Sequence, residues 1–193
     1  LDAIGVPTGS SISIQPIKGR EGLPAKYVVF HPWPGGTLSH VREWPLTRWI
    51  EIAAKFISLG FTIAITGGPG DWERSEGLRS SIGSEQTLNF AGQGDLGDVI
   101  RLLSNADCVV SVNTGIMHLA AAIGAPTIGL NGPTAEHRWG PLGLRAESVS
   151  VPPPFGGYLH LGFEYAGMPL DSMEKITVDQ VWNKALHALQ DHS

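Results

Sequence analysis

The sequence predicts an α/β fold, a Rossmann-like doubly wound parallel sheet of five or six strands. Short apolar runs alternate along the chain with segments whose apolar residues recur at helical spacing. The runs are continuously apolar, as expected of parallel strands that helices cover on both faces. We expect residues 27–193 to form one domain. Residues 1–26 are rich in Gly, Pro and Ser, and we expect them to form a linker or arm.

The first half of the domain shows two strands, each followed by a helix. The run YVVF at 27–30 ends in the loop HPWPGG, and apolar residues from Leu46 to Ile57 then recur at helical spacing. A second run, FTIAIT at 61–66, ends in GGPG, and a polar helix is expected over 72–82.

The second half repeats this alternation. Thr177 and Gln180 form a capping box at the start of an amphipathic helix near the C-terminus. The other expected elements are a short strand at 88–92, a helix at 96–106, a strand at 107–112, a helix at 114–124 and a strand at 126–130.

The composition is that of a globular protein, with 42% hydrophobic and 16% charged residues. A formal net charge of −5 argues against binding to nucleic acid, because the phosphate backbone requires a basic face. A small anionic ligand needs only local positive charge. The single cysteine, Cys108, suits a reducing compartment. No apolar run of about 18 residues and no signal peptide is visible, so we expect no transmembrane helix.

In sheets of this kind, ligands bind outside the carboxyl ends of the strands. One such end is followed by NTG at 113–115, which opens a helix. Asn113 can cap that helix. The backbone N–H groups of Thr114, Gly115 and Ile116, together with the helix dipole, favour an anion there. From the motif alone, a plain helix cap and a phosphate site both remain open.

Other loops at the same edge carry polar side chains. The segment GGPGD is either a flexible turn or a ribose site, in which Asp71 and Glu73 would accept from hydroxyls. The Arg42 side chain is either solvated at the surface or donates two parallel hydrogen bonds to a phosphate. His118 lies one turn beyond Thr114 and could donate to a phosphate or sugar oxygen, or be a structural histidine.

The histidines do not predict a metal site, because their spacings match no zinc pattern and no cysteine supports them. The histidines considered were His31, His40, His118 and His137. Four tryptophans near loops could stack on a base or a sugar, although packing is the default. They are Trp33, Trp44, Trp72 and Trp139.

Three blocks of the sequence together resemble one family. They are HPWPGGTLSHVREWP, TGGPGDWER and NFAGQGDLGDVIRLLSNADCVVSVNTGIMHLAAAIGAPTIGLNGPT. In order and spacing they resemble the C-terminal half of family 9 glycosyltransferases, the bacterial heptosyltransferases of lipopolysaccharide synthesis and their relatives. The resemblance implies a GT-B architecture, in which two Rossmann-like domains face a cleft. It implies that this chain is the second domain, which binds the nucleotide-sugar donor.

The resemblance also implies a set of site residues. Thr114 and Gly115 would hold the diphosphate with backbone N–H groups, with His118 beside it. Arg42 stands where the family often has a phosphate-contacting Lys, and it would stabilise the leaving group. The other implied residues are Thr37 and Ser39 near Arg42, Asp71 or Glu73 near the ribose, Asn113, and Gly132, Pro133 and Thr134 after the fifth strand.

The chain departs from the family pattern in two ways. The family usually has Asp immediately before Thr-Gly, whereas this chain has Asn113, which keeps a cap but loses a negative charge. The proposed catalytic base of the family is an Asp of the N-terminal domain. We therefore expect no catalytic base here and expect the chain to be an excised or truncated half.

The resulting prediction is the sugar-donor-binding half of an inverting glycosyltransferase of heptosyltransferase type. The expected donor is ADP-heptose, with no cofactor and no metal ion. A saccharide or lipid-linked acceptor would bind the other half, so the chain alone is expected to be inactive. The expected location is cytoplasmic, including the inner-membrane surface. The alternatives are a non-catalytic module that binds a nucleotide or nucleotide sugar, and another GT-B enzyme such as a nucleotide-sugar epimerase.

Overall fold

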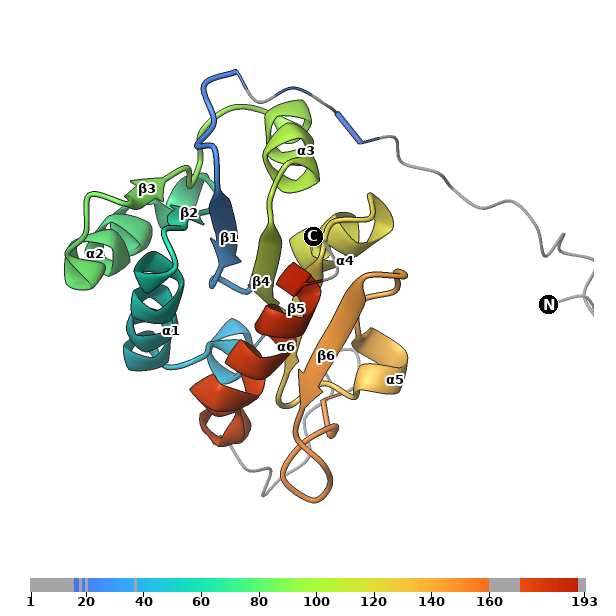
Figure 1. Cartoon of the computed structure of the whole chain (residues 1–193). Coiled ribbons are helices and arrows are strands. Elements are labelled where there is room, and N and C mark those ends of the chain that lie inside the picture. The colour runs from blue at the N-terminus through green and yellow to red at the C-terminus, as the bar shows by residue number, and fades with distance from the viewer. Residues whose placement is uncertain (1–15, 18, 20, 37, 160–170, 191–193) are drawn as a thin grey trace, which may run out of the picture.

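The computed structural model describes residues 16–17, 19, 21–36, 38–159 and 171–190. Six strands form one parallel sheet in the order β3-β2-β1-β4-β5-β6. The strands are β1 (Tyr27–His31), β2 (Thr62–Ile65), β3 (Thr87–Asn89), β4 (Cys108–Val112), β5 (Thr127–Asn131) and β6 (Ala146–Ser150). The chain proceeds outward from β1 to β3 and then returns to β4, so the order reverses between β1 and β4 (Figure 1). The doubly wound parallel sheet is confirmed.

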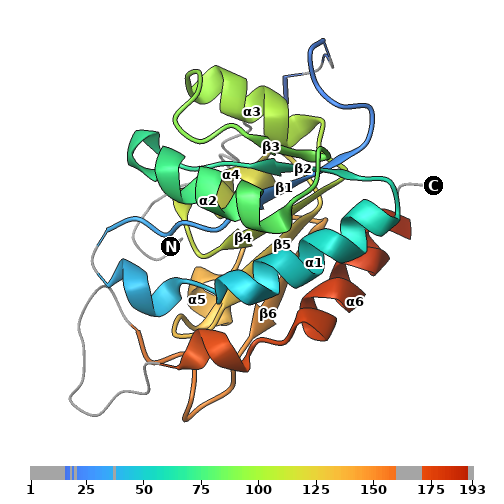
Figure 2. The same cartoon turned by 90° about the vertical axis from the view of Figure 1, so that its left-hand side faces the viewer.

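Helices cover both faces of the sheet (Figure 2). The α-helices are α1 (Leu46–Ser58), α2 (Trp72–Ile82), α3 (Leu96–Ser104), α4 (Gly115–Ala122), α5 (Glu136–Trp139) and α6 (Val178–Gln190). Short 3-10 helices are η2 (Ser39–Arg42), η3 (Pro69–Asp71) and η4 (Ser172–Lys175). Helices α1, α2 and α6 contribute to the apolar core on one face, and α3 and α4 contribute to the core on the other.

Strand β1 shows how the two cores arise. Alternate residues of a strand point to opposite faces. Val28 and Phe30 therefore enter the core under α1, whereas Tyr27 and Val29 enter the core under α3 and α4. The Phe30 ring lies 5.0 Å from the Trp49 ring of α1, measured between centroids. Burial on both faces explains why this strand is a continuous apolar run.

The C-terminal helix begins as the sequence predicts. The Thr177 N–H donates to Gln180 Oε1 at 2.8 Å, and the Gln180 N–H donates to Thr177 Oγ1 at 3.3 Å. These two bonds form the capping box. Strand β6 and helix α5 were not among the expected elements. Most residues of β6 are only partly buried, and a polar edge strand of this kind lacks the apolar run that marks the others.

The described end of the expected arm lies against α3. The Ile17 N–H donates to Ser104 Oγ at 3.2 Å, and Asn105 Nδ2 donates to the Ile17 carbonyl at 3.0 Å. Arg101 donates to the Glu21 carbonyl at 3.0 Å. Residues before the first strand therefore already contact the domain, and the boundary at residue 26 stays a prediction.

Candidate functional site

A cavity of about 460 Å³ opens at the carboxyl edge of the sheet, beside the point where the strand order reverses. Its lining comes from the loops after β1 and β2 and from the first turns of α3 and α4. Among the predicted site residues, Asp71, Thr114 and Gly115 line it. Ligands of doubly wound sheets bind at this position.

The start of α4 forms one wall of the cavity. Thr114 is the N-cap, with an extended backbone, and its Oγ1 accepts from the Met117 N–H at 3.4 Å. The first N–H groups of a helix have no acceptor within the helix, and the dipole makes that end positive. A Cβ added at Gly115 would meet no protein atom within 4 Å. The absent side chain therefore leaves open space in front of these N–H groups.

The expectation that Asn113 caps α4 is wrong, because Thr114 occupies that position. Asn113 is 7% exposed, and its Nδ2 donates to Asn131 Oδ1 at 2.6 Å and to the Trp139 carbonyl. A carbonyl can only accept, so the orientation of the Asn113 amide is defined. The side chain therefore joins the end of β4 to the ends of β5 and α5.

Arg42 joins two loops of the site. Its guanidinium donates to the Asn113 carbonyl at 3.1 Å and to the Gly35 carbonyl. Partial burial lowers the pKa of Arg42 from its ordinary value, although an arginine stays charged at neutral pH. The positive charge thus lies next to Thr114, although Arg42 is not among the residues that line the cavity. Its contact with a phosphate stays a prediction.

Two glycine-rich loops hold the opposite wall. Asp71 Oδ2 accepts from the Gly68 N–H at 2.8 Å. A Cβ at Gly67 would come within 2.8 Å of the Trp33 ring and 2.7 Å of Asp71, so only glycine fits there. The Trp33 Nε1 donates to Ser75 Oγ at 2.7 Å, which shows that Trp33 is packed into the fold.

His31 is a buried polar residue in the cavity wall. It is 6% exposed, and its Nδ1 lies 2.9 Å from Thr66 Oγ1. Burial lowers the pKa of His31 from 6.5 to about 4, so the ring is neutral at pH 7. The sequence raised this residue only as a metal candidate. The signal in the sequence that could have marked it as a cavity-lining residue was its place at the end of an apolar strand.

A second cavity of about 230 Å³ adjoins the first and shares Thr66 and Val99 with it. The loop after β3, including Phe90 and Gln93, forms part of its lining. Neither Thr66 nor Val99 was predicted as a site residue. Val99 is an apolar helix residue, and the sequence does not show whether such a residue lines a cavity or packs in a core.

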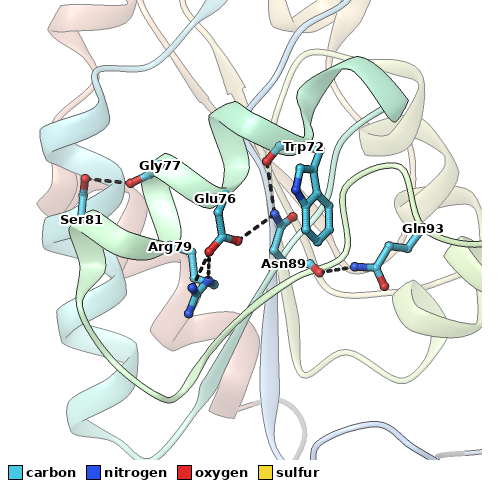
Figure 3. A network of polar contacts seen from close by, with 7 residues as sticks. All are labelled: Trp72, Glu76, Gly77, Arg79, Ser81, Asn89 and Gln93. Atoms are coloured by element: carbon cyan, nitrogen blue, oxygen red, sulfur yellow. Dashed lines mark hydrogen bonds and ion pairs between the residues drawn. The ribbon is translucent and has the colours of Figure 1, made fainter.

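Hydrogen bonds tie the loop after β3 to α2 (Figure 3). Gln93 Nε2 donates to the Asn89 carbonyl at 2.8 Å, and Asn89 Nδ2 donates to Glu76 Oε2 and to the Trp72 carbonyl at 3.3 Å each. Arg79 and Asn89 donate to the Glu76 carboxylate and lower its pKa. The wall of the second cavity is therefore attached to a helix.

Several predicted residues do not line the first cavity. Ser39 lies in η2, Glu73 lies in the exposed first turn of α2, and His118 lies in α4. Partial burial lowers the pKa of His118 from its ordinary value. The loop after β5 packs instead against η4 and β5. In that loop a Cβ at Gly132 would come within 2.6 Å of the Met173 sulfur, and Thr134 donates to Asn131 Oδ1 at 3.0 Å. Pro133 lies between them and accepts from the Leu159 N–H at 2.8 Å. Thr37 lies outside the described residues.

Two further predictions concern metals and membranes. Within the described ranges, no group of three or more His, Cys, Asp or Glu residues could hold a metal ion. In the same part of the chain, no helix combines the length and the apolar character needed to cross a membrane.

The sequence model of glycosyltransferase family 9 (heptosyltransferase) matches residues 11–154. The chain belongs to glycosyltransferase family 9. Lipooligosaccharide heptosyltransferase 2 of Haemophilus influenzae is 31% identical over 121 residues, which cover 61% of this chain and 35% of that protein. Lipopolysaccharide heptosyltransferase 1 of Escherichia coli is 34% identical over 94 residues, which cover 48% of this chain and 28% of that protein.

Solved family 9 structures share the fold. The Escherichia coli ADP-heptose lipopolysaccharide heptosyltransferase II matches with a TM-score of 0.73 at 23% identity, covering 90% of this chain and 50% of that one. The Escherichia coli heptosyltransferase WaaC with ADP matches with a TM-score of 0.67 at 25% identity, covering 87% and 47%. The chain thus spans about half of the solved relatives and about a third of the curated ones. Its fold is one Rossmann-like half of a GT-B architecture.

Proposed function

We propose that this chain is the sugar-donor-binding half of an inverting glycosyltransferase of the lipopolysaccharide heptosyltransferase type, with ADP-heptose as the donor. The observation that carries the proposal is the cavity at the carboxyl edge of the sheet, which the N-cap Thr114 and the first residues of α4 line. Thr114 and Gly115 lie in its wall, and Arg42 adds a positive charge behind them. A helix N-terminus with a nearby arginine suits a diphosphate.

The proposed chemistry is a single displacement at the anomeric carbon of the sugar. The acceptor oxygen forms its bond to that carbon while the bond to the diphosphate oxygen breaks, and a base takes the acceptor proton. The α4 N–H groups and the Arg42 charge stabilise the negative charge that develops on the diphosphate. In this proposal the base and the acceptor site belong to the other half of the GT-B architecture.

The relatives support an adenine nucleotide as the ligand. Two solved forms of the Escherichia coli heptosyltransferase WaaC carry ADP and ADP-2-deoxy-2-fluoro heptose. The dodecameric heptosyltransferase TibC was solved with ADP-D-beta-D-heptose. Each of these chains is about twice as long as the part that this chain matches, which supports the assignment to one half.

The proposal is tested by titrating the chain with ADP and with ADP-heptose in a calorimeter. We expect both to bind, and we expect Gly115→Ala to weaken ADP binding by about tenfold because the new Cβ projects into the space in front of α4. Gly77→Ala is the matched control, since a Cβ there also meets nothing within 4 Å but Gly77 lies on the exposed side of α2. Equal affinity of the two variants for ADP would contradict a diphosphate site at the start of α4.

Asn113 places an uncharged amide where the family usually has Asp, and this favours a second candidate, a module that binds a nucleotide sugar without transferring it. An assay for heptose transfer separates the two candidates when the chain is combined with the N-terminal half of a family 9 relative. Transfer by the combination supports the enzyme, and binding without transfer supports the module. Transfer by the chain alone would contradict its assignment as the sugar-donor half.

A further inference from the structure

His31 is the last residue of β1 and lies opposite Ser111 of β4. It shares a sheet face with Tyr27 and Val29, which is the face covered by α3 and α4. Its ring is therefore directed into the crevice between these helices, where it lines the larger cavity although it is only 6% exposed. No charged group of the described residues pairs with it.

The hydrogen bonds of Thr66 determine the tautomer of His31. The Thr66 hydroxyl has a single proton, which it donates to the Phe30 carbonyl at 3.1 Å. Thr66 Oγ1 must therefore accept from His31, so Nδ1 carries the hydrogen. The neutral ring then presents a bare Nε2 lone pair, for which the described residues provide no hydrogen-bond partner. Because His31 lines the larger cavity, this acceptor is open to a ligand that brings a donor group.

The position of His31 indicates which part of a ligand faces it. The larger cavity contains the start of α4, and the smaller cavity adjoins it at Thr66 and Val99. A ligand with its phosphates at α4 and its other end in the smaller cavity must cross this junction, directly beside the His31–Thr66 pair. A lone pair repels a phosphate oxygen and requires an O–H or N–H group. In a nucleotide, the hydroxyl-bearing unit next to the phosphates is the ribose.

We propose that His31 Nε2 accepts a hydrogen bond from a ribose hydroxyl of the bound nucleotide and thereby selects ribonucleotides over deoxyribonucleotides. Thr66 acts as a positioning residue, because its hydroxyl holds Nδ1–H and keeps Nε2 free to accept. This inference rests on the proposed function, since it assumes that a nucleotide occupies the two cavities.

The test compares four probes on the 193-residue chain: ADP, 2′-deoxy-ADP, 3′-deoxy-ADP and inorganic pyrophosphate. We expect one of the deoxynucleotides to bind about tenfold more weakly than ADP, the effect of one lost hydrogen bond. In His31→Leu this preference should disappear, while pyrophosphate binding is unchanged because pyrophosphate contacts α4. In His31→Gln part of the preference should return, because the glutamine carbonyl oxygen also accepts.

The outcomes separate the inference from the proposed function. A full preference for ADP that persists in His31→Leu, or the same affinity of the unaltered chain for all three nucleotides, would overturn the inference and leave nucleotide binding intact. A chain that binds none of the four probes would contradict the proposed function itself.

A measurement without substitution gives a further check: the ¹⁵N resonance of His31 Nε2 should move when ADP binds and stay in place with pyrophosphate. Movement with both probes would contradict the ribose contact.

Discussion

At the scale of single residues, the sequence predicted the position of Asn113 correctly but not the hydrogen bonds of its side chain. The sequence locates it correctly at the end of β4, just before α4. Its role as a cap is wrong, because the side chain donates instead to Asn131 Oδ1 and to the Trp139 carbonyl. These partners come from segments 18 and 26 residues further along the chain. A local motif carries no information on such distant acceptors.

These contacts predict the effect of introducing the family's usual acid. Asn113→Asp would place a carboxylate oxygen against the Trp139 carbonyl, which cannot donate. We expect the free energy of unfolding to fall by about 1–3 kcal/mol, as for a buried hydrogen bond replaced by an unsatisfied group. Urea unfolding measures this, with Asn183→Asp on the exposed side of α6 as the control of equal charge change. Unchanged stability of Asn113→Asp would show that the loop rearranges to accept the acid.

At the scale of elements, the start of α6 was predicted correctly, whereas the cap of α4 was placed one residue too early. The capping box of α6 lies within four consecutive residues, so Thr177 and Gln180 could be recognised in the sequence. Strand β6 could not be recognised, because its pairing with β5 lies at the sheet edge and exposes most of its residues. The burial that produces a continuous apolar run is absent there.

The α6 cap gives a prediction about this element. Thr177→Ala should lower the free energy of unfolding by about 1 kcal/mol, because the Gln180 N–H loses its acceptor. Thr177→Ser should have little effect, since its hydroxyl can make the same bond. Thermal unfolding with both variants measures the difference. Equal melting temperatures for the Ala and Ser variants would show that the cap does not stabilise α6.

At the scale of the whole molecule, a buried neutral histidine links stability to pH. Burial holds the pKa of His31 at about 4, below its ordinary value of 6.5. Between these values the unfolded chain binds the proton more tightly, so stability is complete above pH 6.5 and is lost as the pH falls toward 4. The shift corresponds to about 3 kcal/mol.

The pH dependence is measured by urea unfolding at pH 7, 5 and 4. Carboxylates also titrate in this range, so the comparison is with His31→Gln, which lacks the ring. We expect the unaltered chain to lose more stability than the variant between pH 7 and pH 5, where most histidine protonation in the unfolded state occurs. Parallel curves for the two proteins would contradict a depressed pKa at His31.

The sequence by itself determined the parallel doubly wound sheet, the order of its main elements and the edge of the sheet at which the cavity opens. These follow from local periodicity, since strands covered on both faces must be apolar runs and their carboxyl ends must share one edge. Thr114, Gly115 and Asp71, which line the cavity at that edge, were predicted in this way. Only the tertiary structure decided that His31, Thr66 and Val99 share a cavity, and that Asn113 is an amide donor rather than a cap. Those assignments depend on partners brought together from separate strands and helices, which a one-dimensional pattern does not encode.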